Sequence, residues 1–123
     1  MEGLPRLAEQ LEWLIDHIPG PDGRRYTSAR LADEVRRHGA SVSASYIGHM
    51  RQGRTKDIGA ARLAAVARAF DVPLDFFVNP DLERRLRADI ENLTEVRDRS
   101  LAEFRDTAVD GALRTIAERR RST

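Results

Sequence analysis

The chain has 123 residues, of which 41% are hydrophobic and 33% are charged, and its formal net charge at pH 7 is +1. This composition predicts one small domain with a heavily solvated surface, and the absence of cysteine excludes disulfide frameworks and thiolate metal sites. No apolar run approaches the ~20 residues of a membrane span and the first residues lack a signal-peptide pattern, so we expect a cytoplasmic protein without a membrane partner.

Two amphipathic helices are predicted in the first third of the chain. The first runs from about Arg6 to His17, because apolar residues recur there at spacings of three and four. A loop rich in proline and glycine follows, and Thr27 or Ser28 then caps a second helix that ends at Gly39. With aromatic residues at only 6%, this pattern favours an all-α fold.

A short polar helix and a strongly apolar helix are predicted next. Ser43 caps the polar helix, Ile47 and Met50 turn inward, and Gly53 ends it. Asp57 is expected to cap the apolar helix, which leads into a proline-started turn. The residues expected to complete the core are Leu63, Val66, Phe70, Val72, Leu74, Phe76 and Phe77.

Asn79–Pro80 is the predicted boundary between a first domain (1–79) and a C-terminal helical region (80–123). Arginines and carboxylates are balanced beyond this boundary, which suits pairing along a helix surface. The apolar stripe of this region takes a five-residue step, so we expect a kink or a break near 97–100. Asp110–Gly111 is a second weak point in the predicted helix.

The apolar stripe after the boundary is too long to be satisfied by a domain already closed by its own aromatic residues. Burial against a second copy would remove the stripe from water at ~25 cal/mol per Å², so we expect a homodimer. The alternatives are a tail that folds back on its own domain and a solvated charged helix. The expected dimerisation residues are Leu82, Leu86, Ile90, Leu93, Val96, Leu101 and Phe104.

The polar helix at about Ser43–Gln52 meets the demands of docking in the major groove of double-stranded DNA. That groove is roughly 12 Å wide and admits one helix, which reads bases mainly through its N-terminal residues. Ser45 can exchange hydrogen bonds with base edges, and Ala44 offers a methyl group to thymine. Tyr46 reaches a phosphate or a base, or packs at the core edge, and His49 donates to guanine or is an idle surface residue.

Basic residues follow this helix without any acidic residue between positions 42 and 56. Such side chains are candidates for phosphate contacts, which fix the register of a protein on DNA without reading its sequence. The alternative for Arg54 and Lys56 is plain solubilising charge. The full set of candidate backbone contacts is Arg51, Arg54, Thr55 and Lys56, together with Arg24, Arg25 and Ser28 from the loop before and the start of the second helix.

The motifs S-x-S-Y-I, R-Q-G-R and L-A-x-V-A-R-A-F-D-V-P-L-D-F-F resemble the Xre/Cro/cI-type helix-turn-helix regulators over Leu7–Phe77. Ala32 to Gly39 takes seven residues where typical members take about four, and this longer second helix is similar to that of the EspR-type nucleoid-associated regulators of actinobacteria. The resemblance implies a five-helix, lambda-repressor-like domain and dimerisation through C-terminal helices. It also implies recognition through the third helix, at Ser43, Ala44, Ser45, Tyr46 and His49.

We therefore expect a sequence-specific, double-stranded DNA-binding transcriptional regulator that acts as a homodimer in the nucleoid. One alternative is an architectural protein that bridges distant DNA sites, and another is an antitoxin-like module whose main partner is a second protein. An enzyme is not expected, because His17, His38 and His49 are scattered and no glycine-rich phosphate loop follows a strand. No cofactor, metal or small-molecule ligand is expected.

Overall fold

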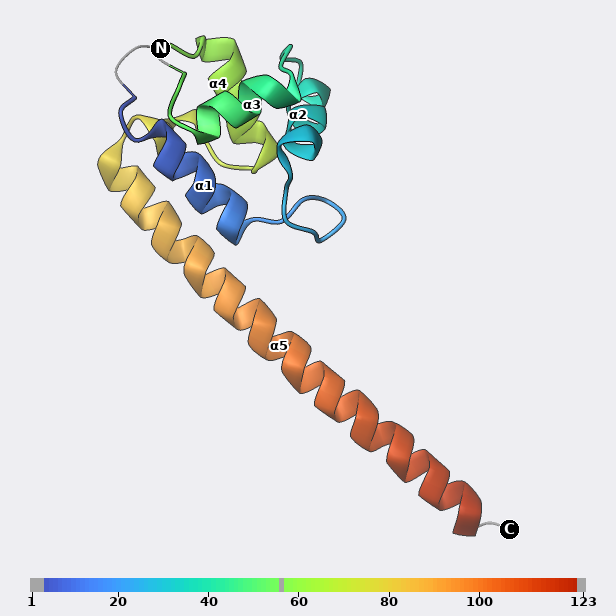
Figure 1. The fold of residues 1–123 in the computed structure, drawn as a ribbon. Coiled ribbons are helices and arrows are strands. Elements are labelled where there is room, and N and C mark those ends of the chain that lie inside the picture. Colours follow the sequence, from blue (N-terminus) through green and yellow to red (C-terminus); the bar gives the residue numbers. More distant parts are fainter. Residues whose placement is uncertain (1–3, 56, 122–123) are drawn as a thin grey trace. The chain divides into compact units, whose positions relative to one another are not determined.

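The computed structural model describes the backbone of residues 4–55 and 57–121, and the side chains of these residues up to position 100. Within those residues every regular element is helical and none is a strand, which confirms the predicted all-α fold. The elements, which Figure 1 shows in chain order, are α1 (Leu7–His17), α2 (Ser28–Arg37), α3 (Ala44–Arg51), α4 (Ala60–Ala69), the 3-10 helix η1 (Leu74–Phe77) and α5 (Pro80–Arg121).

The ends of α2 and α3 are set by local side-chain and glycine signals. The Thr27 hydroxyl accepts a hydrogen bond from the Arg30 N–H at 3.2 Å, which caps α2. The chain leaves α2 through Gly39 with φ +93°, and it leaves α3 through Gly53 with φ +73°. Both glycines adopt the left-handed backbone that is strained for other residues, so each helix ends at a fixed point.

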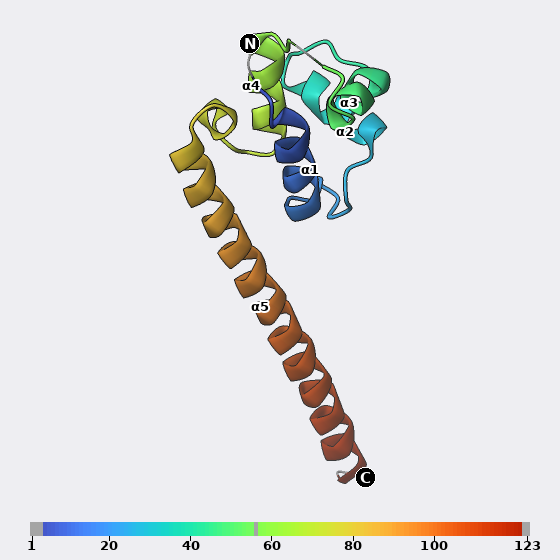
Figure 2. The ribbon, with the colours of Figure 1, turned by 60° about the vertical axis from the view of Figure 1, so that its left-hand side comes forward.

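α3 is held by two neighbouring helices. It packs against α1 and α2, and α2 also packs against α4; Figures 1 and 2 both show α2 and α3 next to each other. Ile47 of α3 has no exposed surface, and Met50 is 1% exposed. Burial of these two side chains leaves Ala44, Ser45 and His49 of α3 on the outside of the domain.

The aromatic side chains around η1 close the core. Phe76 and Phe77 are buried with their rings edge-to-face at 5.4 Å between centroids, and Phe76 also lies 6.2 Å from Trp13 of α1. Leu74, which was expected in the core, is only half-buried, because the two phenylalanines fill the interior at this point.

The predicted cap of α4 at Asp57 is wrong. α4 begins at Ala60, and Gly59, which has no side chain, takes the N-cap position. Ile58 is 1% exposed. Because this residue must reach the core from the loop, the helix starts only after it.

The predicted kink or break near 97–100 is also wrong, as is the weak point at Asp110–Gly111, because α5 is one continuous helix. The five-residue step in the apolar stripe concerns which face the side chains occupy and leaves the backbone hydrogen bonds intact. One glycine inside a helix costs only about 1 kcal/mol relative to alanine, which a helix of this length tolerates.

Asn79, at the predicted domain boundary, caps α5. Its side-chain oxygen accepts hydrogen bonds from the N–H groups of Asp81 at 3.1 Å and Leu82 at 3.2 Å. The chain divides into one compact unit that spans Met1–Arg87 and a second that spans Ala88–Thr123. The first two turns of α5 are therefore part of the same compact unit as α1–α4.

A cluster of polar side chains joins those first turns of α5 to α1. Glu83 is 3% exposed and accepts hydrogen bonds from Arg6 at 3.0 and 2.9 Å and from Gln10 at 2.8 Å. Arg87 pairs with Glu83 at 2.7 Å and with Glu9 at 2.8 Å. We call these five residues the Glu83 cluster.

The Glu83 cluster is also electrostatically balanced. Hydrogen bonds from Arg87 and then Arg6 lower the pKa of Glu9 below its ordinary value. The contribution of Glu9 to stability is therefore present above its ordinary pKa and is lost as the pH falls through the lowered one. The Arg87 guanidinium lies 4.8 Å from the centroid of the Trp13 ring, which covers it on one side.

Candidate nucleic-acid interface

The N-terminal half of α3 presents small polar groups on an open face. The Ser43 hydroxyl accepts a hydrogen bond from the Tyr46 N–H at 3.0 Å and so fixes where the helix begins. Ala44, Ser45 and His49 are exposed. The residues predicted as base readers thus share the outside of one helix, apart from Tyr46.

Tyr46 is placed differently from the other predicted readers. Its side chain is half-buried, and its hydroxyl has no hydrogen-bond partner among the described residues although it is shielded from solvent. The guanidinium of Arg62, from the first turn of α4, lies 4.9 Å from the centroid of the Tyr46 ring. The ring therefore supports an arginine at the edge of the α3 face.

Gly48 lies in the middle of α3 and carries no side chain. A Cβ atom added at Gly48 would meet no atom within 4 Å beyond its chain neighbours and the backbone of its own helix. The position has space in the isolated chain, and its bare backbone permits close approach of a large ligand. Next to it lies a hollow of ≈ 350 Å³, whose lining residues are Glu12, Ser28, Gly48, Arg51 and Gln52.

Arg51, a predicted phosphate contact, is engaged inside the protein. Its guanidinium pairs with Glu12 of α1 and donates to the Ser28 hydroxyl at 3.1 Å. Its side chain is 26% exposed. Arg51 thus connects α3 to α1 and α2, and the Glu12 carboxylate already balances its charge.

The two arginines of the loop before α2 differ in whether a carboxylate pairs with the guanidinium group. Arg25 pairs with Asp16 and, at 3.4 Å, with Glu12, so two carboxylates share its charge. The exposed Arg24 is held through its backbone, where its N–H donates to the Asp22 carboxylate at 3.1 Å. Within the described residues, Arg24 has no ion pair.

The segment after α3 contains an arginine whose side chain has no carboxylate partner among the described residues. Arg54 is exposed, and its backbone N–H donates to the His49 carbonyl at 2.9 Å, which fixes the turn. Its guanidinium reaches the Gln52 amide oxygen at 3.5 Å, a weak contact with a neutral group. Thr55 is half-buried, and Lys56 lies outside the described residues.

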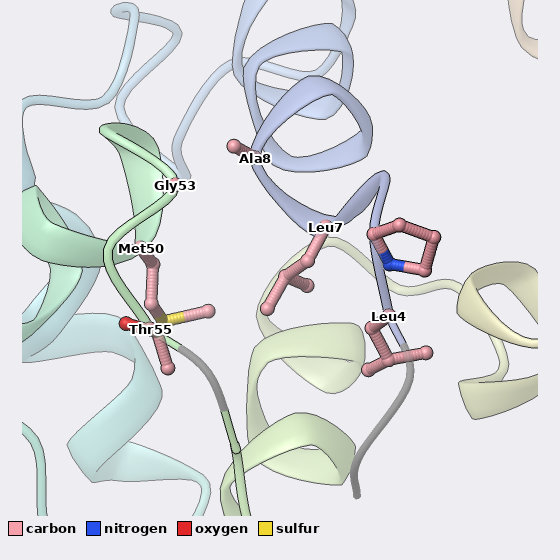
Figure 3. Close-up of a pocket in the computed structure, with 7 residues that line it drawn as sticks. Leu4, Leu7, Ala8, Met50, Gly53 and Thr55 are labelled. Carbon is pink, nitrogen blue, oxygen red and sulfur yellow. The ribbon is translucent and has the colours of Figure 1, made fainter.

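A cavity of ≈ 540 Å³ lies behind the C-terminal end of α3. Figure 3 shows the side chains of Met50, Leu7 and Leu4 around it, with Thr55 beside Met50. The residues that line it are Leu4, Pro5, Leu7, Ala8, Met50, Gly53 and Thr55, none of which is charged. Thr55 supplies the only hydroxyl among these lining residues, so they offer little to orient a polar ligand.

The described residues contain no group of three or more histidine, cysteine, aspartate or glutamate side chains that could hold a metal ion. Across the part of the chain that the structure describes, no helix combines the length and the apolar character that crossing a membrane requires.

The predicted dimerisation residues lie along α5. Leu82, Leu86 and Ile90 are half-buried, whereas Leu93 is 68% exposed and Val96 is 57% exposed. The side chains of two further predicted residues, Leu101 and Phe104, lie outside the described residues. Leu93 and Val96 therefore leave apolar surface uncovered in the single chain.

Three side chains of this region were not predicted as contributors. Glu12 holds Arg51, while Arg36 and Arg62 reach the turn between α2 and α3. Each acts across 6 to 39 residues of sequence. Only Arg36 carried a local signal, since a basic residue in the last turn suits the negative end of a helix.

No known family model matches the chain. The chain is similar to the nucleoid-associated protein EspR of Mycobacterium tuberculosis, from the strains CDC 1551 / Oshkosh and ATCC 25618 / H37Rv. Each relative is 26% identical to it over 91 residues, and the match covers 74% of this chain and 69% of the relative. This similarity agrees with the resemblance to the EspR-type group that the residues of the second and third helices indicated.

Proposed function

We propose that this protein is a DNA-binding, nucleoid-associated regulator that places α3 in the major groove of double-stranded DNA. The observation that carries the proposal is the outer face of α3, where Ala44, Ser45 and His49 are exposed above the buried Ile47 and Met50. No acidic residue lies between positions 42 and 56 to repel phosphates. The similarity to a nucleoid-associated protein supports the same assignment.

In this proposal the arginines around α3 divide into two roles. Arg24 and Arg54 are exposed and lack carboxylate partners among the described residues, so they contact DNA phosphates. Arg51, which Glu12 and Ser28 hold, positions α3 relative to α1 and α2. The DNA contacts of α3 depend on this internal bracing as well as on its exposed face. We also infer a binding protein rather than an enzyme.

The sequence preference of the protein tests this proposal. We expect His49→Ala to change the bases selected from a randomised duplex library at one position of the site, since each good base contact discriminates by about 1–3 kcal/mol. Arg54→Gln should instead lower the affinity for all sequences alike, because a phosphate contact carries no base information. Arg68→Gln is the matched charge control, because Arg68 is an exposed arginine in the last turn of α4.

Two outcomes of that selection separate the candidate roles. A palindromic consensus would identify a regulator that acts at local operators, whereas a loose motif would identify a protein that bridges distant sites. If His49→Ala retains the wild-type consensus and only loses affinity, His49 does not read bases.

A homodimer belongs to the same proposal, because one such domain contacts too few bases to be selective in a genome. We expect Leu93→Lys to weaken self-association roughly a thousandfold, since two leucines per dimer would lose about 2 kcal/mol of burial each. Sedimentation equilibrium measures this change. Asn92→Lys, which adds the same charge at the neighbouring exposed position, should leave the dimer intact; equal weakening by both variants would argue against a contact at Leu93.

A further inference from the structure

A polar cavity lies at the N-terminal end of α3, beside the face that we propose reads DNA. It has a volume of ≈ 340 Å³ and is open to solvent. The end of α2, the turn that follows it, and the starts of α3 and α4 all contribute to its walls. The lining residues are Arg36, Ser41, Val42, Ser43, Tyr46 and Arg62.

Arg62 is held in this cavity without being neutralised. Its Nε–H donates to the Ser41 carbonyl at 3.3 Å, and its guanidinium lies over the Tyr46 ring. Both partners are neutral groups that orient the side chain and leave its positive charge in place. Among the described residues, no carboxylate pairs with Arg62, which is exposed.

Arg36 brings a second guanidinium to the same cavity. It donates to the Val42 carbonyl at 2.7 Å and pairs through its other terminal nitrogen with Asp33. Two arginines from α2 and α4 thus clamp consecutive carbonyl groups of the turn that leads into α3. This arrangement fixes both guanidinium groups relative to the start of the proposed reading helix.

The lining of this cavity differs in charge from two other hollows that contain arginine. The hollow around Tyr26 contains Asp22, Asp33 and Glu34, and the one beside Gly48 contains Glu12. The cavity at Arg62 has two arginines and no carboxylate among its lining residues. It also includes Tyr46, whose shielded hydroxyl has no partner within the described residues, a state that calls for an explanation in a native protein.

We propose that this cavity binds a phosphate group of the DNA backbone, with Arg62 as its principal ligand and Arg36, whose charge Asp33 balances, as a further N–H donor. Guanidinium groups match the geometry of phosphate oxygens, and the positive end of α3 adds to the attraction. Ser43, the N-cap of α3, and Tyr46 of α3 both line this cavity, so a duplex docked on α3 carries phosphates close by. The inference rests on the proposed function and specifies one of its contacts.

The test is the salt dependence of duplex binding by the full chain. Replacing Arg62 by glutamine removes one phosphate contact per subunit, so the log–log slope should become shallower by about 0.9 per subunit, or about 1.8 for a homodimer. Arg62→Lys keeps the charge and should keep most of the slope. Arg68→Gln removes an equal charge from the last turn of α4 and should leave the slope unchanged.

The outcomes separate this inference from the proposed function. Weak, salt-insensitive binding by the wild-type protein would contradict the proposed function itself. A steep salt dependence of binding by the wild-type protein, with equal slopes for Arg62→Gln and Arg68→Gln, would overturn only the phosphate site. A titration of the wild-type protein with inorganic phosphate at constant ionic strength completes the test, with the Arg62 Nε–H resonance as its readout. If this resonance shifts saturably while Arg62→Gln keeps the wild-type slope for duplex binding, the cavity binds a free anion, and the DNA contact is overturned.

Discussion

The Glu83→Gln variant is expected to unfold at a midpoint roughly 12–24 °C below that of the wild-type protein. Glu83 is 3% exposed and receives hydrogen bonds or ion pairs from Arg6, Gln10 and Arg87. Removal of one partner of a buried ion pair costs about 3–5 kcal/mol, and the lower end applies here because the Arg6 side chain is 53% exposed. Each kcal/mol lowers the midpoint of a domain of this size by roughly 4–8 °C.

Glutamine is a stringent test of the role of the Glu83 carboxylate, because it preserves the shape of the side chain and removes its charge. Its amide retains one acceptor oxygen but turns an N–H₂ group toward the arginine donors, so at least one guanidinium loses an acceptor and keeps only its contact with Glu9. Arg87 is the more sensitive of the two arginines, since its side chain is only 19% exposed. Thermal unfolding followed by circular dichroism measures the change.

Glu91→Gln is the matched control for Glu83→Gln. Glu91 is exposed on the same helix, and the substitution changes the net charge by the same amount. A surface substitution of this kind normally stays within about 0.5 kcal/mol of wild type. If the two variants unfold at the same temperature, the Glu83 cluster does not hold the start of α5 against α1.

The helix positions in the first compact unit could be predicted from sequence because their signals are local. Thr27 and Ser43 are short hydroxyl side chains that accept from an N–H three residues onward, and Gly39 and Gly53 follow the last turns of their helices. Each signal needs only a few neighbouring residues to act. Such signals fail at Asp57, because the burial of Ile58 outweighs the local capping preference.

The polar contacts could not be predicted, because their partners are far apart in the chain. Arg6 and Glu83 are separated by 77 residues, and Glu12 and Arg51 by 39. In the sequence Glu83 is one of ten carboxylates in a balanced region, and nothing local marks it as buried. Arg62 likewise reads as an ordinary helix-surface cation until the fold brings Ser41 and Tyr46 beside it.

We expect the affinity for double-stranded DNA to fall roughly 10³-fold between about 50 and 200 mM salt. About three phosphate contacts per subunit give roughly six per homodimer, which corresponds to a log–log slope of about −5. The exposed Arg24, Arg54 and Arg62 supply the cations that displace counterions in this account. Phosphate contacts act on any duplex, so the expectation holds for random genomic fragments as well as for an operator.

The most direct test of α3 as a DNA-binding element is a salt titration of duplex binding by the wild-type protein and two charge variants. Ser45→Glu places a carboxylate on the exposed face of α3, and Asn92→Glu places the same charge on an exposed position of α5. We predict a slope of about −5 for wild type and Asn92→Glu, and loss of binding for Ser45→Glu with an unchanged unfolding midpoint. A wild-type slope shallower than about −3, or binding by Ser45→Glu equal to that of Asn92→Glu, would contradict the account.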